Sequence, residues 1–60
     1  MKVNEFVRMA KAKGCYVKRH GKRHDIWYSP ITGRTFSIPR HGSQELARGL
    51  ADEAKEVLGL

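Results

Sequence analysis

The sequence predicts an α+β fold in the order helix, strand, strand, strand, helix, with a three-stranded antiparallel sheet and two helices on one face. Three observations predict it. Apolar residues recur at helix spacing near both ends of the chain, whereas the middle of the chain alternates apolar and polar residues. Glycine and proline mark the turns between the alternating stretches. With 60 residues, the chain is expected to form one domain, residues 1–60, with one thin core.

The first helix is predicted over residues 4–13. Asn4 is a favourable N-cap, and Glu5 suits the first turn. The apolar positions that follow have helix spacing: Phe6, Val7, Met9 and Ala10. Gly14 is typical of the residue that follows a helix end, because glycine readily adopts positive φ.

Three strands are predicted in the middle of the chain, over residues 15–20, 23–28 and 34–38. Gly21-Lys22 turns the chain between the first two, which makes a hairpin. Residues 29–33 contain a proline and a glycine and form the second turn. Pro39 closes the third strand, since proline is poorly placed inside a paired ladder.

The closing helix is predicted to begin at Ser43 as its N-cap, with Glu45 in the first turn. Its apolar stripe is formed by Leu46, Leu50, Ala54, Val57 and Leu58. Gly49 weakens the helix by roughly 1 kcal/mol relative to alanine, and close packing against the sheet would explain its presence.

The core predicted from these elements lies between the helices and one face of the sheet, and the other face is left to solvent. Its members are Phe6, Val7, Ala10, Val17, Ile26, Phe36, Ile38, Leu46, Leu50 and Val57. Alternation puts His24 on the same side as Ile26, which is expected to face the helices. His24 is therefore expected beyond the edge of the core or after a bulge.

Positive charge is concentrated in the first two thirds of the chain. The net charge is +6, and residues 1–42 carry ten Lys and Arg against two acidic residues. Four fixed positive charges and two histidines fall within the seven residues Lys18-Arg19-His20-Gly21-Lys22-Arg23-His24. Such a run lies on the surface, as a solvated hairpin tip or as a site for a polyanion such as RNA or DNA.

Several protein classes are disfavoured by composition and length. A chain this short has no room for the enclosed active site of a small-molecule enzyme. Its single cysteine cannot form an internal disulfide, so a reducing cytoplasm is the expected location. No signal peptide is visible, and the short apolar runs exclude a membrane span.

The motifs and their order resemble a known family. A basic hairpin is followed by a histidine, the strand end Ile26-Trp27-Tyr28-Ser29-Pro30, a Thr-Gly-Arg turn, a Phe-Ser-Ile-Pro strand, Arg-His-Gly, and a helix that runs to Leu-Gly-Leu. This order resembles the HicA family of toxins from Phe6 to Leu60. The resemblance implies a fold like the double-stranded-RNA-binding domain, cleavage of mRNA that inhibits translation, and a HicB-like antitoxin as the protein partner.

The family's catalytic histidine lies at the start of the second strand, and the position that matches it is His24, preceded here by Lys22-Arg23 where the family usually has Gly-Ser. Cleavage of RNA needs a proton acceptor or donor and positive charge, because the RNA supplies its own 2′-hydroxyl nucleophile. His24 is therefore expected to be the general acid or base. The residues expected to hold phosphates are Lys18, Arg19, Lys22, Arg23 and Arg34. Neither a metal nor another cofactor is expected.

Other interpretations of the same residues remain open. A non-catalytic RNA- or DNA-binding module would use the same basic surface. Cys15 is typical of a small buried apolar residue rather than a nucleophile, and the spacing of Cys15, His20, His24 and His41 matches no familiar zinc site. His20 and His41 either assist catalysis or have structural or RNA-contacting roles. Three aromatic residues either stack a base or pack within the protein: Tyr16, Trp27 and Tyr28.

Overall fold

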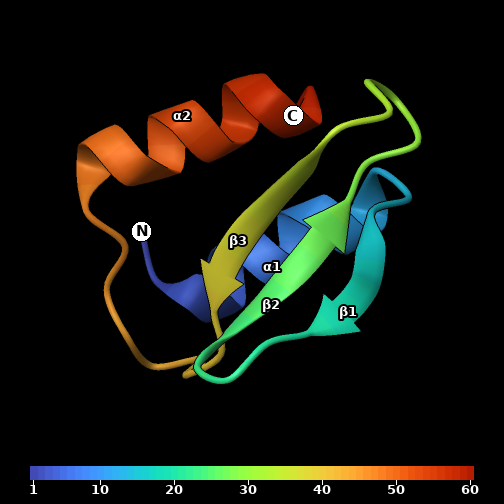
Figure 1. The fold of residues 1–60 in the computed structure, drawn as a ribbon. Coiled ribbons are helices and arrows are strands. Elements are labelled where there is room, and N and C mark those ends of the chain that lie inside the picture. Colours follow the sequence, from blue (N-terminus) through green and yellow to red (C-terminus); the bar gives the residue numbers. More distant parts are fainter.

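The predicted order of elements is confirmed by the computed structural model, which describes residues 1–60. The elements are helix α1 (Val3–Ala12), strands β1 (Tyr16–His20), β2 (His24–Tyr28) and β3 (Thr35–Pro39), and helix α2 (Arg48–Leu58). The strands form one antiparallel sheet in the order β1-β2-β3. Figure 1 shows α1 behind the sheet and α2 alongside β3, which α2 contacts. Both helices therefore cover the same face of the sheet.

The inward face of the sheet differs from the prediction by one residue in β2. Trp27 is buried with 4% of its surface exposed, whereas Ile26 is only half-buried. Trp27 pairs with Val17 on one side and Phe36 on the other, so three apolar side chains form a row toward the helices. The expectation that Ile26 faces the helices was wrong, because the row around the larger indole buries more apolar surface.

The position of His24 follows from this correction. Side chains alternate along β2, so His24 shares the outer face with Ile26 and Tyr28, away from the helices. No bulge in β2 is needed to place it there. The bulge instead lies in β1, where Val17 pairs with Trp27 and Arg19 pairs with Ile26, which leaves Lys18 as the extra residue.

The loop between β3 and α2 caps the start of α1. The amide of Val3 donates to Gln44 O over 2.9 Å, and the amide of Asn4 donates to Gly42 O over 3.0 Å. The N-cap of α1 is therefore Lys2, two residues before the predicted Asn4, and the Lys2 side chain forms no capping hydrogen bond. Backbone carbonyls from a distant segment satisfy the free amides that a side chain normally satisfies.

The same pairing delays the start of α2. Residues 42–46 are held against the N-terminal segment, so α2 begins at Arg48 with Ala47 at its N-cap, and the predicted cap at Ser43 was wrong. Leu46 is buried but precedes the helix, and Leu50 is 39% exposed. The buried stripe of α2 is Ala51, Ala54 and Leu58. A Cβ added at Gly49 would have no neighbour within 4 Å, so the expected close packing there was also wrong.

The core joins all the elements and contains ten buried apolar residues: Val3, Phe6, Ala10, Cys15, Trp27, Ile38, Leu46, Ala51, Ala54 and Leu58. Val7, Val17, Phe36 and Val57 pack against it from half-buried positions. Gly14 has φ +90°, which confirms the predicted end of α1. Neither helix has the length and apolar character needed to cross a bilayer.

The turn between β2 and β3 fixes the end of α2. The fully buried Ser29 donates from Oγ to Leu58 O over 2.6 Å, and Thr32 donates from Oγ1 to Val57 O over 2.7 Å. These two hydroxyls satisfy carbonyl groups that a helix end leaves free. Gly33 adopts φ +72° in this turn, whose place in the chain was predicted.

Replacing Gly42 by alanine is expected to destabilise the protein by about 1 kcal/mol, measured by urea unfolding. A Cβ at this position would overlap the side chain of Asn4, which has to leave its present rotamer or push the loop away from the start of α1. The double variant G42A/N4A removes the obstructing side chain and should recover most of the lost stability. Equal loss in the single and double variants would contradict this explanation.

Gly49→Ala is the matched control, because it adds the same methyl group in open space. It should leave the unfolding midpoint unchanged or raise stability by up to about 1 kcal/mol, since alanine is the better helix former.

Candidate functional site

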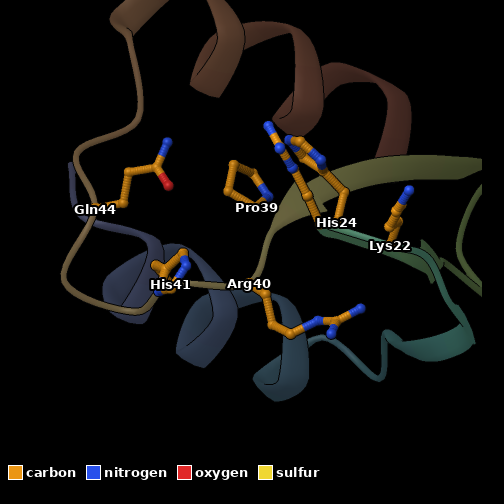
Figure 2. A pocket seen from close by; sticks show the side chains of 7 residues that line it. Lys22, His24, Pro39, Arg40, His41 and Gln44 are labelled. Atoms are coloured by element: carbon orange, nitrogen blue, oxygen red, sulfur yellow. The ribbon is translucent and has the colours of Figure 1, made fainter.

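His24 lies in a hollow at one end of the sheet, which we call the histidine hollow. Its volume is about 650 Å³, and its lining residues are Lys22, Arg23, His24, Pro39, Arg40, His41 and Gln44. Lys22 and Arg23 come from the β1–β2 turn, His24 begins β2, Pro39 ends β3, and the last three belong to the following loop. In the view of Figure 2, His24 and His41 lie on the two sides of Pro39.

The histidine hollow is strongly positive. Lys22, Arg23 and Arg40 contribute three fixed charges, and no carboxylate lines the hollow. Cations that converge on a concave surface attract anions and raise their local concentration. Two imidazoles within this surface add groups that can accept or donate a proton. The arrangement can therefore hold a phosphate beside two groups able to transfer protons.

One wall of the hollow is held by a set of polar contacts, the Arg40 clamp, which consists of His20, Gly21, Asp25 and Arg40. Arg40 Nε donates to Asp25 Oδ1 over 3.1 Å, and Arg40 Nη2 donates to Gly21 O. His20 Nδ1 donates to the same carboxylate oxygen over 2.9 Å. The hydrogen bond from His20 and the charge of Arg40 hold the pKa of Asp25 below its ordinary value.

The β1–β2 turn depends on a close backbone approach at Gly21. Its amide donates to His24 O over 2.8 Å, and a Cβ at this position would lie only 2.5 Å from the same oxygen. Any larger residue would therefore push the turn away from His24. Glycine at this position lets the basic turn close directly onto the start of β2.

The six predicted site residues do not all lie together. Lys22, Arg23 and His24 line the histidine hollow. Lys18 and Arg19 line a second, smaller hollow of about 300 Å³ with Ile26 and Thr35. Arg34 is exposed just before β3, at the end of the sheet opposite His24. The basic residues are thus distributed along the sheet rather than around one point.

Two of the three aromatic candidates are accessible. Tyr16 is 54% exposed, Tyr28 is half-buried, and Trp27 belongs to the core and cannot stack on a ligand. The two tyrosine rings lie 5.4 Å apart at an interplanar angle of 48°, and Lys18 Nζ lies 5.7 Å from the centre of the Tyr28 ring. A cation and two aromatic rings therefore meet at the end of the sheet away from His24.

The other chemical candidates have structural positions. Cys15 is free and buried in the core, with 4% of its surface exposed, as predicted for an apolar residue. No three His, Cys, Asp or Glu side chains come together as the ligands of a metal ion would. His20 is bonded to Asp25 and does not line the histidine hollow, whereas His41 does.

Sequence reasoning missed Arg40, Gln44 and the clamp. Arg40 and Asp25 are 15 residues apart in the sequence, and no short-range pattern predicts their contact. The one signal in the sequence was the lone carboxylate of Asp25 within the most basic part of the chain. An acidic residue in such a place commonly has a cationic partner.

A comparison with protein families gives one result. The family described as HicA toxin of bacterial toxin-antitoxin matches residues 3–60. The chain belongs to the HicA toxin family. No match was found among the curated proteins or among the solved structures.

Membership of the HicA family confirms the resemblance seen in the sequence and covers essentially the whole chain. It gives the protein the role of a toxin within a toxin–antitoxin system, and such a toxin has an antitoxin partner. The αβββα order with an open sheet agrees with the fold like the double-stranded-RNA-binding domain that the resemblance implied.

Asp25→Asn is expected to lower the free energy of unfolding at pH 6–7 by about 1–3 kcal/mol, because His20 and Arg40 lose a charged acceptor. The folded-state pKa of Asp25 is lowered from 3.8, so its contribution is complete above that pH and is lost as the pH falls through the folded pKa. The difference between wild type and variant should therefore shrink below about pH 4.

Urea unfolding at pH 3, 4, 5 and 7 measures this dependence. Asp52→Asn is the control, because Asp52 is exposed on α2 and forms no ion pair. A loss from Asp25→Asn that is constant across this range would show that the carboxylate charge is not what stabilises the clamp.

Proposed function

We propose that this HicA-family toxin is an endoribonuclease that cleaves mRNA and thereby inhibits translation, with His24 as a general acid or base. The observation that carries the proposal is the exposed His24 in a hollow with three fixed cations and no carboxylate. Family membership supports a toxin, and RNA cleavage is a reaction by which so small a protein can act on a polymer without an enclosed pocket.

Cleavage of RNA requires few groups from the protein, because the RNA supplies the nucleophile. The 2′-hydroxyl of RNA attacks the adjacent phosphorus, the bond to the 5′ oxygen breaks, and the products are a 2′,3′-cyclic phosphate and a 5′-hydroxyl. An imidazole that takes or gives a proton contributes typically about 10²–10⁴-fold to such a step. Lys22 and Arg23 beside His24 stabilise the negative charge that develops on the phosphoryl oxygens. No metal ion is needed for this route.

Single-stranded RNA is proposed to lie along the outer face of β2. His24 and Tyr28 are at the two ends of this strand, roughly 13 Å apart at the rise of an extended chain. Lys18 and Arg19 border the middle of the path and Arg34 its far end. These cations are proposed to bind phosphates, while exposed Tyr16 and half-buried Tyr28 offer rings on which a base can stack.

The partner proposed for this surface is a HicB-like antitoxin protein. A surface with cations from Lys18 to Arg23 and two tyrosines would be covered by an acidic protein segment, which blocks RNA and neutralises the repulsion among the cations. The cytoplasm, where mRNA is translated, is the proposed location.

His24→Ala is expected to reduce cleavage of a structureless RNA by about 10²–10⁴-fold. Binding should change by no more than a factor of a few, because the cations remain. Cleavage is followed on a gel with detection of 2′,3′-cyclic phosphate ends, and binding is measured with DNA of the same sequence, which lacks the nucleophile. Wild-type protein that binds but does not cut would instead support a non-catalytic RNA- or DNA-binding module.

Lys22→Ala and Arg23→Ala should each weaken RNA binding and flatten its salt dependence. For single strands, the slope of log K against log salt concentration falls by about 0.7 for each phosphate contact removed. Arg48→Ala is the matched control, because it removes the same charge at the start of α2, outside the histidine hollow. If all three variants change the slope equally, binding reflects net charge rather than this surface.

A further inference from the structure

His24 and His41 line the same hollow although 16 residues separate them in the sequence. Figure 2 shows His24 at the end of the sheet and His41 on the loop after β3. His20 differs from both, because its ring is bonded to Asp25 and it does not line the hollow. Of the three histidines, His41 is thus the one that shares the surroundings of His24.

The position of His41 is fixed from both sides. The preceding residue, Arg40, is bonded to Asp25 and to the carbonyl of Gly21. The following residue, Gly42, accepts the amide of Asn4 over 3.0 Å and touches the start of α1. The carbonyl of His41 also accepts the amide of Gln44 over 3.1 Å. Although His41 is exposed on a loop, its backbone is therefore held to two separate elements.

The Arg40 clamp also connects the loop that carries His41 to the strand that begins at His24. Gly21 accepts a hydrogen bond from Arg40 and donates one to the carbonyl of His24 over 2.8 Å. The residue beside His41 and the backbone of His24 are consequently joined through a single intermediate residue. A pair of groups held in this way can act on opposite sides of one phosphate.

We propose that His24 and His41 form a proton-transfer pair, an inference that rests on the proposed ribonuclease function. One imidazole removes the proton of the 2′-hydroxyl as its oxygen attacks phosphorus. The other gives a proton to the 5′ oxygen as the phosphorus–oxygen bond breaks. The pair ends with its protons exchanged and the charge unchanged, so no external reactant is consumed. Lys22, Arg23 and Arg40 surround the phosphate during this exchange.

The test compares two RNA substrates of one sequence. The first has the ordinary 5′ oxygen at the cleavage site, and the second has sulfur there, a leaving group that departs without a proton. On the ordinary substrate, His24→Ala and His41→Ala should each lose about 10²–10⁴-fold in rate. On the sulfur substrate, only the variant that lacks the proton donor should recover to near the wild-type rate.

Recovery of one variant and not the other cannot come from a purely structural defect, because the protein is the same on both substrates. Arg48→Ala is the control, since Arg48 lies on α2, outside both the hollow and the Arg40 clamp. The pH–rate profile of wild type should be bell-shaped, and each single variant should lose one limb. Unfolding midpoints of all variants confirm that they are folded.

The outcomes separate the two proposals. If His41→Ala cuts the ordinary substrate like wild type while His24→Ala does not, the ribonuclease function stands and the pair is wrong. If both variants remain equally slow on the sulfur substrate, neither histidine donates the proton to the leaving oxygen, and the proposed pair is again wrong. If wild-type protein cuts neither substrate, the ribonuclease function itself fails.

Discussion

The carboxylate of Asp25 is the constraint on which the functional end of the molecule depends. It lies on the face of the sheet that the helices cover, and only 14% of its side chain is exposed. A carboxylate in this position is costly unless cations and hydrogen-bond donors surround it. His20 and Arg40 meet this requirement from two other segments, and Arg40 continues to the carbonyl of Gly21. One charge thereby fixes the end of β1, the basic turn and the loop after β3 relative to one another.

Elsewhere in the fold, loops and turns form hydrogen bonds with the ends of the two helices. Residues 42–46 supply carbonyls to the amides at the start of α1, while Ser29 and Thr32 donate to the last carbonyls of α2. A chain of this length buries only about 60% of its unfolded surface. Loops that satisfy helix ends therefore replace part of the stabilisation that a larger core would provide. The loop between β3 and α2, which caps the start of α1, also carries His41 and Gln44 of the histidine hollow, so the stability of the fold and the geometry of the site depend in part on the same segment.

Much of the fold could be predicted from local patterns, and the errors occurred where long-range contacts override them. The number, type and order of elements followed from periodicity and from Gly14, Gly21 and Gly33. Ser43 and Glu45 have the local pattern of a helix start, but the pairing of residues 42–46 with the N-terminal segment takes precedence. Ile26 and Trp27 are both apolar, so alternation alone could not decide which faces the core, and the pairing across three strands decided it. His24 was predicted as a site residue through a resemblance, whereas the contact of Arg40 with Asp25 and the sharing of one hollow by His24 and His41 could be seen only in the folded chain.

Both edges of the sheet are also protected against pairing with another chain. An open strand presents free amides and carbonyls that can template association and aggregation. In β1, the bulge places the extra residue Lys18 where it interrupts a regular ladder and adds a charge. In β3, Pro39 removes an amide at the strand end. The two edges of the sheet thus carry features that oppose pairing with another strand, although the outer face of the sheet is uncovered.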